Sequence, residues 1–142
     1  MPKIITHNIN ETKKLAQKIA KNAKFDDIFA LIGQIGAGKT TFIQGFVQNF
    51  NIKKNVTSPT FVIINEYKIA AKKKIVHLDL YRLEKIDQNL SEQIMEYFQN
   101  PQNICLIEWA EKIKKILPKK TKFINFKVLG ENLREISYDF NN

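Results

Sequence analysis

Residues 33–40 read Gly33-Gln34-Ile35-Gly36-Ala37-Gly38-Lys39-Thr40, which fits the pattern G-x-x-x-x-G-K-[ST]. The apolar run at residues 28–32 comes directly before them, and such a run predicts a strand that is covered on both faces. Residues 39–50 then predict a helix. A glycine-rich loop between a buried strand and a helix is the context in which this pattern binds phosphate, so the stretch indicates a P-loop.

The chemistry of phosphate binding accounts for the residue types in this loop. Glycines permit positive φ angles and bring backbone N–H groups close to phosphate oxygens, and the positive end of the following helix adds to the attraction. We expect the Lys39 ammonium to reach the β- and γ-phosphates and the Thr40 hydroxyl to bind Mg²⁺. The loop residues predicted to hold the nucleotide are Gly33, Gly36, Ala37, Gly38, Lys39, Thr40 and Thr41.

A P-loop protein also needs an acidic residue near the metal, usually at the end of a neighbouring buried strand. Glu108 follows the apolar run at residues 104–107, and Asp79 lies in the run at residues 75–80. Either carboxylate can hold Mg²⁺ directly or through water, or orient the attacking water, and the spacing leaves these roles open. We interpret His77 as a hydrogen-bonded structural residue, because a lone histidine in a strand is more often structural than catalytic.

Three hydroxyl side chains surround Pro59, namely Thr57, Ser58 and Thr60. They fit a switch-like loop that places a hydroxyl near the γ-phosphate, and they fit a simple turn equally well. The spacing does not decide between the two.

The rest of the chain alternates apolar runs with helical patterns and contains no repeat or linker, so residues 1–142 are predicted to form a single domain. Strands are expected at residues 3–6, 28–32, 61–67, 75–80, 104–107, 122–128 and 134–140. Helices are expected at residues 11–23 with Asn10 as N-cap, 39–50, 87–98 and 110–117. The expected fold class is α/β: a P-loop NTPase-like mixed sheet with a parallel centre, antiparallel C-terminal strands and flanking helices.

The composition narrows the class of protein. The formal net charge of +9 favours anionic partners. Cys105 is the only cysteine, which excludes a fold stapled by intrachain disulfides. No apolar run approaches the ~18 to 20 residues of a membrane span, and the N-terminal residues lack the apolar core of a signal peptide. We therefore expect a cytoplasmic protein that does not contact membranes.

Two other functions compete with an ATPase. A small P-loop kinase of a metabolite needs a substrate segment and an arginine-bearing lid, but only one helical stretch and Arg82 lie between Tyr81 and Ile104. A guanine-reading N-K-x-D segment is missing, which favours ATP over GTP. A basic RNA-binding module would use the lysine clusters at residues 53–54, 72–74, 112–115 and 119–120. The ten phenylalanines, however, follow core patterns rather than an exposed stacking array.

Four separated segments together resemble the TsaE family, also called YjeE, the ATPase component of the bacterial system that makes threonylcarbamoyladenosine beside the tRNA anticodon. They are residues 33–42, Thr57-Ser58-Pro59-Thr60-Phe61, His77-Leu78-Asp79-Leu80-Tyr81-Arg82 and Glu108-Trp109. The P-loop is shared by many families, and the other three segments make the resemblance specific.

The resemblance implies Mg²⁺-dependent ATP binding and hydrolysis, weak without the partner proteins TsaD and TsaB, with tRNA engaged only through the complex. It implies catalytic roles for Lys39, Asp79 and Glu108, with Thr40 and Glu108 holding Mg²⁺. It further implies that Trp109 lies beside the nucleotide, that Arg134 contacts the base, and that residues 57–61 and 77–82 resemble switch segments. Gln34 stands where the family commonly has Asp, a change that we expect to affect hydrolysis more than binding.

Overall fold

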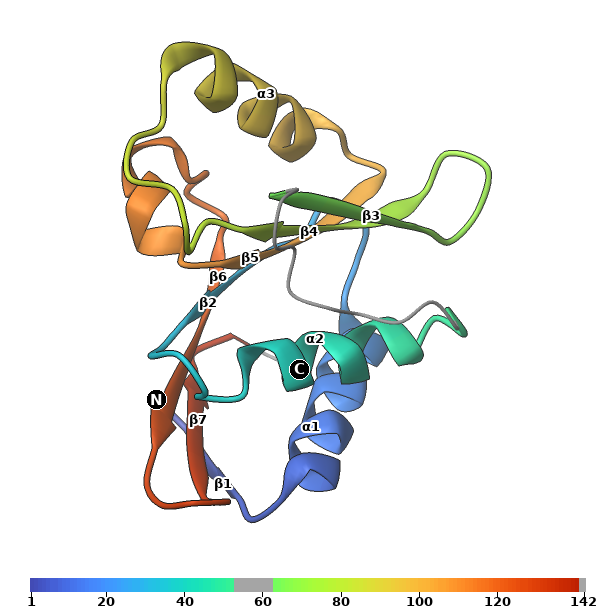
Figure 1. Cartoon of the computed structure of the whole chain (residues 1–142). Coiled ribbons are helices and arrows are strands. Elements are labelled where there is room, and N and C mark those ends of the chain that lie inside the picture. The colour runs from blue at the N-terminus through green and yellow to red at the C-terminus, as the bar shows by residue number, and fades with distance from the viewer. Residues whose placement is uncertain (53–62, 141–142) are drawn as a thin grey trace.

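The computed structural model describes residues 1–52 and 63–140, and within these ranges one seven-stranded mixed sheet forms the centre of the protein (Figure 1). The elements in chain order are β1 (Lys3–Thr6), α1 (Ile9–Asn22), β2 (Ile28–Ile32), α2 (Lys39–Gln48), β3 (Ile64–Lys68), β4 (Lys74–Asp79), α3 (Gln88–Gln99), β5 (Asn103–Glu108), the 3₁₀ helix η1 (Ala110–Ile116), β6 (Lys122–Val128) and β7 (Arg134–Tyr138).

The strand order is β1-β7-β6-β2-β5-β4-β3. Strand β2 pairs in parallel with both β5 and β6, and β4 pairs in parallel with β5. The pairs β6–β7, β7–β1 and β4–β3 are antiparallel. This arrangement confirms the predicted fold class. Because parallel strands end at the same edge of a sheet, the residues after β2, β4 and β5 are brought together.

Helices cover both faces of the sheet. Figure 1 shows α1 and α2 on one side and α3 on the other. Phe29 and Leu31 of β2 pack in the core under α1 and α2, whereas Ile28 and Ala30 pack in the second core under α3 and η1. A strand buried on both faces has to be apolar at every position, which is why residues 28–32 form a continuous apolar run.

Helix α1 begins earlier than the sequence pattern predicts, because Asn8 rather than Asn10 is its N-cap. The Asn8 side chain accepts a hydrogen bond from the Glu11 backbone N–H at 2.9 Å. The Glu11 carboxylate in turn accepts the His7 backbone N–H at 2.8 Å. The pair is close to a capping box but differs from it, because Glu11 accepts the N–H of the residue before the N-cap rather than that of Asn8 itself.

Two other predicted elements are longer than the observed ones. Helix α2 ends at Gln48 and β7 at Tyr138, each two residues before the predicted end. Phe50 and Phe140 still pack against the core, so the apolar pattern continues beyond the regular backbone. The strand predicted at residues 61–67 is observed as β3, from Ile64, and residues 61–62 lie outside the described residues. Among the described helices, none combines the length and apolar character that a membrane crossing requires.

Candidate functional site

The loop between β2 and α2 has the backbone of a phosphate cradle. Gly36 and Gly38 have φ angles of 76° and 99°, in the region that disfavours any residue with a Cβ. Gly38 is the N-cap of α2 and makes no side-chain capping bond, and the positive N-terminal end of a helix attracts an anion. Gly33 is needed for a different reason: a Cβ there would lie 2.7 Å from the Phe126 carbonyl oxygen of β6.

Lys39 is a buried cation at the start of α2. Its Nζ donates to the Gly33 carbonyl oxygen at 2.6 Å and lies 3.9 Å from the centroid of the Trp109 ring. Burial lowers the pKa of Lys39 below the usual value for lysine, while the charges of Glu108, Glu111 and Asp79 act in the opposite direction. A desolvated ammonium beside a helix N-terminus is suited to bind an anion.

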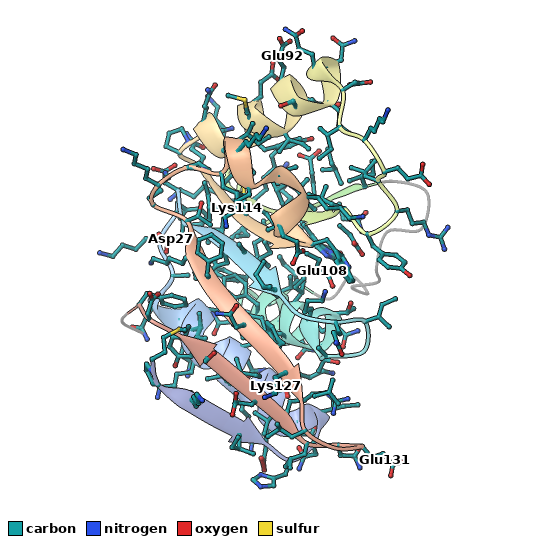
Figure 2. The ribbon with its side chains drawn as sticks, turned by 90° about the vertical axis from the view of Figure 1, so that its left-hand side faces the viewer. Asp27, Glu92, Glu108, Lys114, Lys127 and Glu131 are labelled. Carbon is teal, nitrogen blue, oxygen red and sulfur yellow. The ribbon has the colours of Figure 1, made fainter. Side chains whose placement is uncertain are left out.

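The Glu108 carboxylate, at the end of β5, is contacted from two directions. Thr40 Oγ1 donates to Glu108 Oε1 at 3.4 Å, and His77 Nε2 lies 2.7 Å from Glu108 Oε2. Glu108 and His77 are both buried. In Figure 2, Glu108 lies in the middle of the view, between Glu92 near one end of the molecule and Glu131 near the other. His77 is therefore hydrogen-bonded, as the sequence predicts, but its partner is a predicted metal ligand.

Asp79 is the last residue of β4 and lies opposite Glu108 in the parallel register. Its Oδ1 accepts the Tyr81 backbone N–H at 3.0 Å, which orients the carboxyl group. Burial, and after it the negative charge of Glu108, raises the pKa of Asp79 above its ordinary value of 3.8. The two predicted acidic residues thus stand side by side at the edge of the sheet where α2 begins.

Arg134, the first residue of β7, reaches the phosphate loop from the far side. Its Nη2 donates to the Gly36 carbonyl oxygen at 3.0 Å. Its Nη1 donates to the carbonyl oxygens of Gly130, Glu131 and Leu133 at 2.8, 3.2 and 3.0 Å. The guanidinium therefore ties the turn between β6 and β7 to the loop.

These residues line one cavity of about 640 Å³. This volume lies within the range of small-molecule sites. The predicted residues on its wall are Gly36, Gly38, Lys39, Thr40, Thr41, Asp79, Glu108, Trp109 and Arg134. Gly33 and Ala37 are not on the wall; Gly33 packs against Phe126, and Ala37 is buried in the core. The segment predicted to resemble a switch at residues 57–61 lies outside the described residues.

Sequence reasoning missed part of the cavity wall. Asn8, Ile9 and Thr12 come from the start of α1, and Asn132 comes from the turn before β7. They meet because β1 pairs with β7, which no local pattern indicates. Tyr81 also lies on the wall and packs against Trp109 with ring centroids 5.2 Å apart. Its only sequence signal is its place in the segment at residues 77–82.

The donor set of the cavity fits a nucleotide with Mg²⁺. Mg²⁺ is usually held by one or two carboxylates together with phosphate oxygens and water. The oxygen atoms of the Thr40 hydroxyl and the Glu108 carboxylate lie together at one point, next to the N-terminus of α2. Lys39, Arg82 and Arg134 supply the positive charge of the wall.

Comparison with known proteins adds an independent finding. A family model described as "Threonylcarbamoyl adenosine biosynthesis protein TsaE" matches residues 6–136. The chain is similar to the tRNA threonylcarbamoyladenosine biosynthesis protein TsaE of Bacillus subtilis (strain 168), with 41% identity over 133 residues covering 94% of this chain and 82% of the relative. The protein of the same description from Aquifex aeolicus (strain VF5) is 34% identical over 138 residues, covering 96% and 94%. The crystal structure of Bacillus subtilis YdiB is similar with a TM-score of 0.79 and 36% identity, covering 96% of this chain and 83% of that one.

Proposed function

The chain belongs to the TsaE family of threonylcarbamoyl adenosine biosynthesis proteins, and we propose that its part in modifying tRNA is to bind Mg²⁺-ATP at the P-loop and hydrolyse it. One observation carries the proposal. The Lys39 ammonium, the Thr40 hydroxyl and the Glu108 carboxylate converge on one cavity at the N-terminus of α2. P-loop hydrolases require this combination of groups.

Phosphate binding falls to the loop and to Lys39. The N–H groups of the first turn of α2 point along the helix axis toward the cavity end and attract negative charge. The Lys39 side chain is already held in place by the Gly33 carbonyl and the Trp109 ring, so little rotamer freedom remains to be lost on binding. A buried charge is unfavourable unless it has a partner of opposite charge, and phosphate oxygens would supply such partners to the Lys39 ammonium.

Thr40 and Glu108 would hold the metal. When bound, Mg²⁺ neutralises charge on the β- and γ-phosphate oxygens and orients them for displacement. Glu108 presents its carboxylate in one orientation, because Thr40 and His77 contact different oxygens of it. Thr40 joins this site directly to the first turn of α2, so the phosphate and metal sites share one rigid element.

Asp79 is the residue that we assign to the attacking water. Hydrolysis forms a bond from the water oxygen to the γ-phosphorus and breaks the bond to the bridging oxygen, giving ADP, phosphate and a proton. The raised pKa of Asp79, caused first by burial and then by Glu108, makes its carboxylate a better proton acceptor. The Tyr81 N–H keeps that carboxyl group oriented.

We further propose that hydrolysis is slow until TsaB and TsaD bind, and that the protein acts in the cytoplasm and meets tRNA through these partners. Among the described residues, the arginines on the cavity wall are Arg82 and Arg134. Arg82 is exposed, and the guanidinium of Arg134 is engaged by backbone carbonyls. Neither arginine is held in place to stabilise the negative charge of the transition state, which is the role of an arginine finger. A partner protein that supplied such an arginine, or that positioned one of these two, would therefore speed up hydrolysis. No observation favours the kinase or the RNA-binding module over this assignment.

ATP hydrolysis by the purified protein with Mg²⁺, first by itself and then with TsaB and TsaD, tests the proposal. We expect slow hydrolysis that rises when both partners are present and is lost in Lys39→Ala. The control is Lys127→Ala, which removes an exposed lysine of β6. ATP affinity and turnover that survive Lys39→Ala would rule out the P-loop assignment. Fast hydrolysis that is unchanged by the partners would rule out the dependence on them.

A further inference from the structure

The His77 imidazole and the Glu108 carboxylate form a buried contact across two parallel strands. His77 Nε2 lies 2.7 Å from Glu108 Oε2, and the two side chains are 0% and 4% exposed. Asp79 pairs with Glu108 and His77 pairs with Leu106, so His77 and Glu108 are diagonal neighbours on one face of the sheet. This is the face that α1 and α2 cover, since Leu106 packs in the same core as Phe42 and Phe46 of α2. The register of the sheet therefore fixes the contact.

The contact leaves the second oxygen of the carboxylate facing α2. Glu108 Oε2 is next to His77, whereas Oε1 accepts the hydrogen bond from Thr40 Oγ1 at 3.4 Å. If the group at Oε2 were removed, the carboxylate could rotate about its terminal torsion, which has a broad energy well. Hydrogen bonds behind a ligating group commonly set its orientation toward a metal.

The surroundings of the ring decide which nitrogen carries the proton. Within residues 1–52 and 63–140, His77 Nδ1 is buried and has no hydrogen-bond partner. A proton on Nδ1 would be a buried donor without an acceptor, whereas a proton on Nε2 points at a carboxylate oxygen. The arrangement therefore favours the tautomer in which Nε2–H donates to Glu108 Oε2.

We propose that His77 is a positioning residue for Mg²⁺: its Nε2–H holds Glu108 Oε2 so that Oε1 stays beside Thr40, where the metal would bind. This inference rests on the function proposed above. His77 is fully buried and is not on the cavity wall, so it acts through Glu108 and does not touch the nucleotide. It gives a function to a histidine that the sequence pattern by itself makes purely structural.

Two substitutions separate the hydrogen bond from the packing. A glutamine amide nitrogen reaches about the position of histidine Nε2, whereas an asparagine amide reaches only the position of Nδ1. His77→Gln therefore keeps a donor toward Glu108, and His77→Asn loses it while remaining polar. The measurement is a titration of Mg²⁺ into protein with a fluorescent ADP analogue, accompanied by the affinity for the analogue in EDTA.

We expect His77→Asn to weaken the apparent Mg²⁺ affinity by roughly 10- to 100-fold, the usual effect of losing a hydrogen bond behind a metal ligand. His77→Gln should remain close to the wild type, and the affinity in EDTA should not change in either variant. In a Glu108→Gln background, His77→Asn should cause no further loss. An equal loss in that background would mean that His77 acts by general packing, and the inference would be wrong.

A second measurement needs no substitution. Nitrogen NMR of the wild-type imidazole should show the proton of His77 on Nε2, with a signal that shifts when Mg²⁺ is added to the ADP-bound protein. A proton on Nδ1 would overturn the inference. So would Mg²⁺-dependent nucleotide binding in the wild type that His77→Asn leaves intact, and that result would leave the proposed function standing. Wild-type protein that binds no nucleotide with Mg²⁺ would overturn both.

Discussion

Replacing Arg134 by lysine tests whether this residue holds the phosphate loop or the nucleotide base. The guanidinium spans two structures, with Nη2 on the Gly36 carbonyl and Nη1 on three carbonyls of the turn at residues 130–133. A lysine ammonium is a point donor and cannot reproduce a planar fork that reaches both sides. Arg134→Lys should therefore release the link between Gly36 and the turn while keeping the charge.

The magnitude follows from the single bond that reaches the loop. Hydrogen bonds to charged groups contribute ~1.5–3 kcal/mol, and we take about 1 kcal/mol for this one because it is solvent-exposed. Since 1.4 kcal/mol corresponds to a factor of ten, nucleotide affinity should fall by roughly fivefold. The loss should be the same for every ligand that the loop holds by its phosphates.

The assay is a titration of wild type and Arg134→Lys with ADP, GDP and pyrophosphate in the presence of Mg²⁺. A loop-holding arginine predicts an equal loss for all three ligands, because each needs the loop. A base-contacting arginine, which the family resemblance implies, predicts an unchanged affinity for pyrophosphate and an altered ratio of ADP to GDP. That second result would refute the loop-holding role. Arg82→Lys, the same exchange at the chain's other arginine, is the matched control.

Three further predictions follow from the site. Lys39→Met should weaken nucleotide binding by at least about tenfold, which an ADP titration measures. It should change the free energy of unfolding, measured in urea, by less than about 1 kcal/mol, because the lost contact with Trp109 is offset by removal of a buried charge. Asp79→Asn should lower the rate of hydrolysis by roughly 100-fold and should stabilise the protein at neutral pH, because burial and then Glu108 raise the pKa of Asp79. Gly33→Ala should cost about 1–3 kcal/mol in urea unfolding, because its Cβ would lie 2.7 Å from the Phe126 carbonyl oxygen.

Each of these predictions has a result that contradicts it. For Asp79, the native state binds the proton more tightly than the unfolded state, so the wild type loses stability as pH rises from 3.8 to the raised pKa. The advantage of Asp79→Asn should therefore be present above that window and vanish below it; an advantage independent of pH would contradict the cause given. Unchanged stability of Gly33→Ala would show that β6 can move away, and unchanged ADP affinity of Lys39→Met would place the phosphates elsewhere.

The sequence predicts those parts of the molecule that depend on neighbours along the chain. The P-loop can be predicted because Gly36 and Gly38 act through their own backbone, and because Lys39 and Thr40 follow directly in the first turn of the helix that begins at Lys39. The buried strands are visible because both of their faces are apolar. The apolar pattern does not locate the ends of strands and helices, since Phe50 and Phe140 extend it past the regular elements.

Contacts between distant residues depend instead on the strand order. Arg134 and Gly36 are 98 residues apart, and they meet because β7 pairs with β6 and β6 pairs with β2. Neither pairing has a local sequence signal that connects it with the phosphate loop. The position of Arg134 after Gly130 in the sequence therefore does not by itself indicate that Arg134 reaches the phosphate loop; the strand order does.

His77 shows the same dependence more sharply, because one residue of register decides its role. In the observed parallel pairing of β4 with β5, His77 and Glu108 share a face of the sheet. A shift of β4 by one residue would turn the His77 side chain to the opposite face, under α3, and a shift of β5 by one residue would turn the Glu108 side chain there instead. Either shift would separate the two side chains. The sequence shows that residue 77 is a histidine, but the role of its imidazole depends on the contact with the Glu108 carboxylate. The pairing of two buried strands is thus what converts an isolated histidine into a group that can orient a metal ligand.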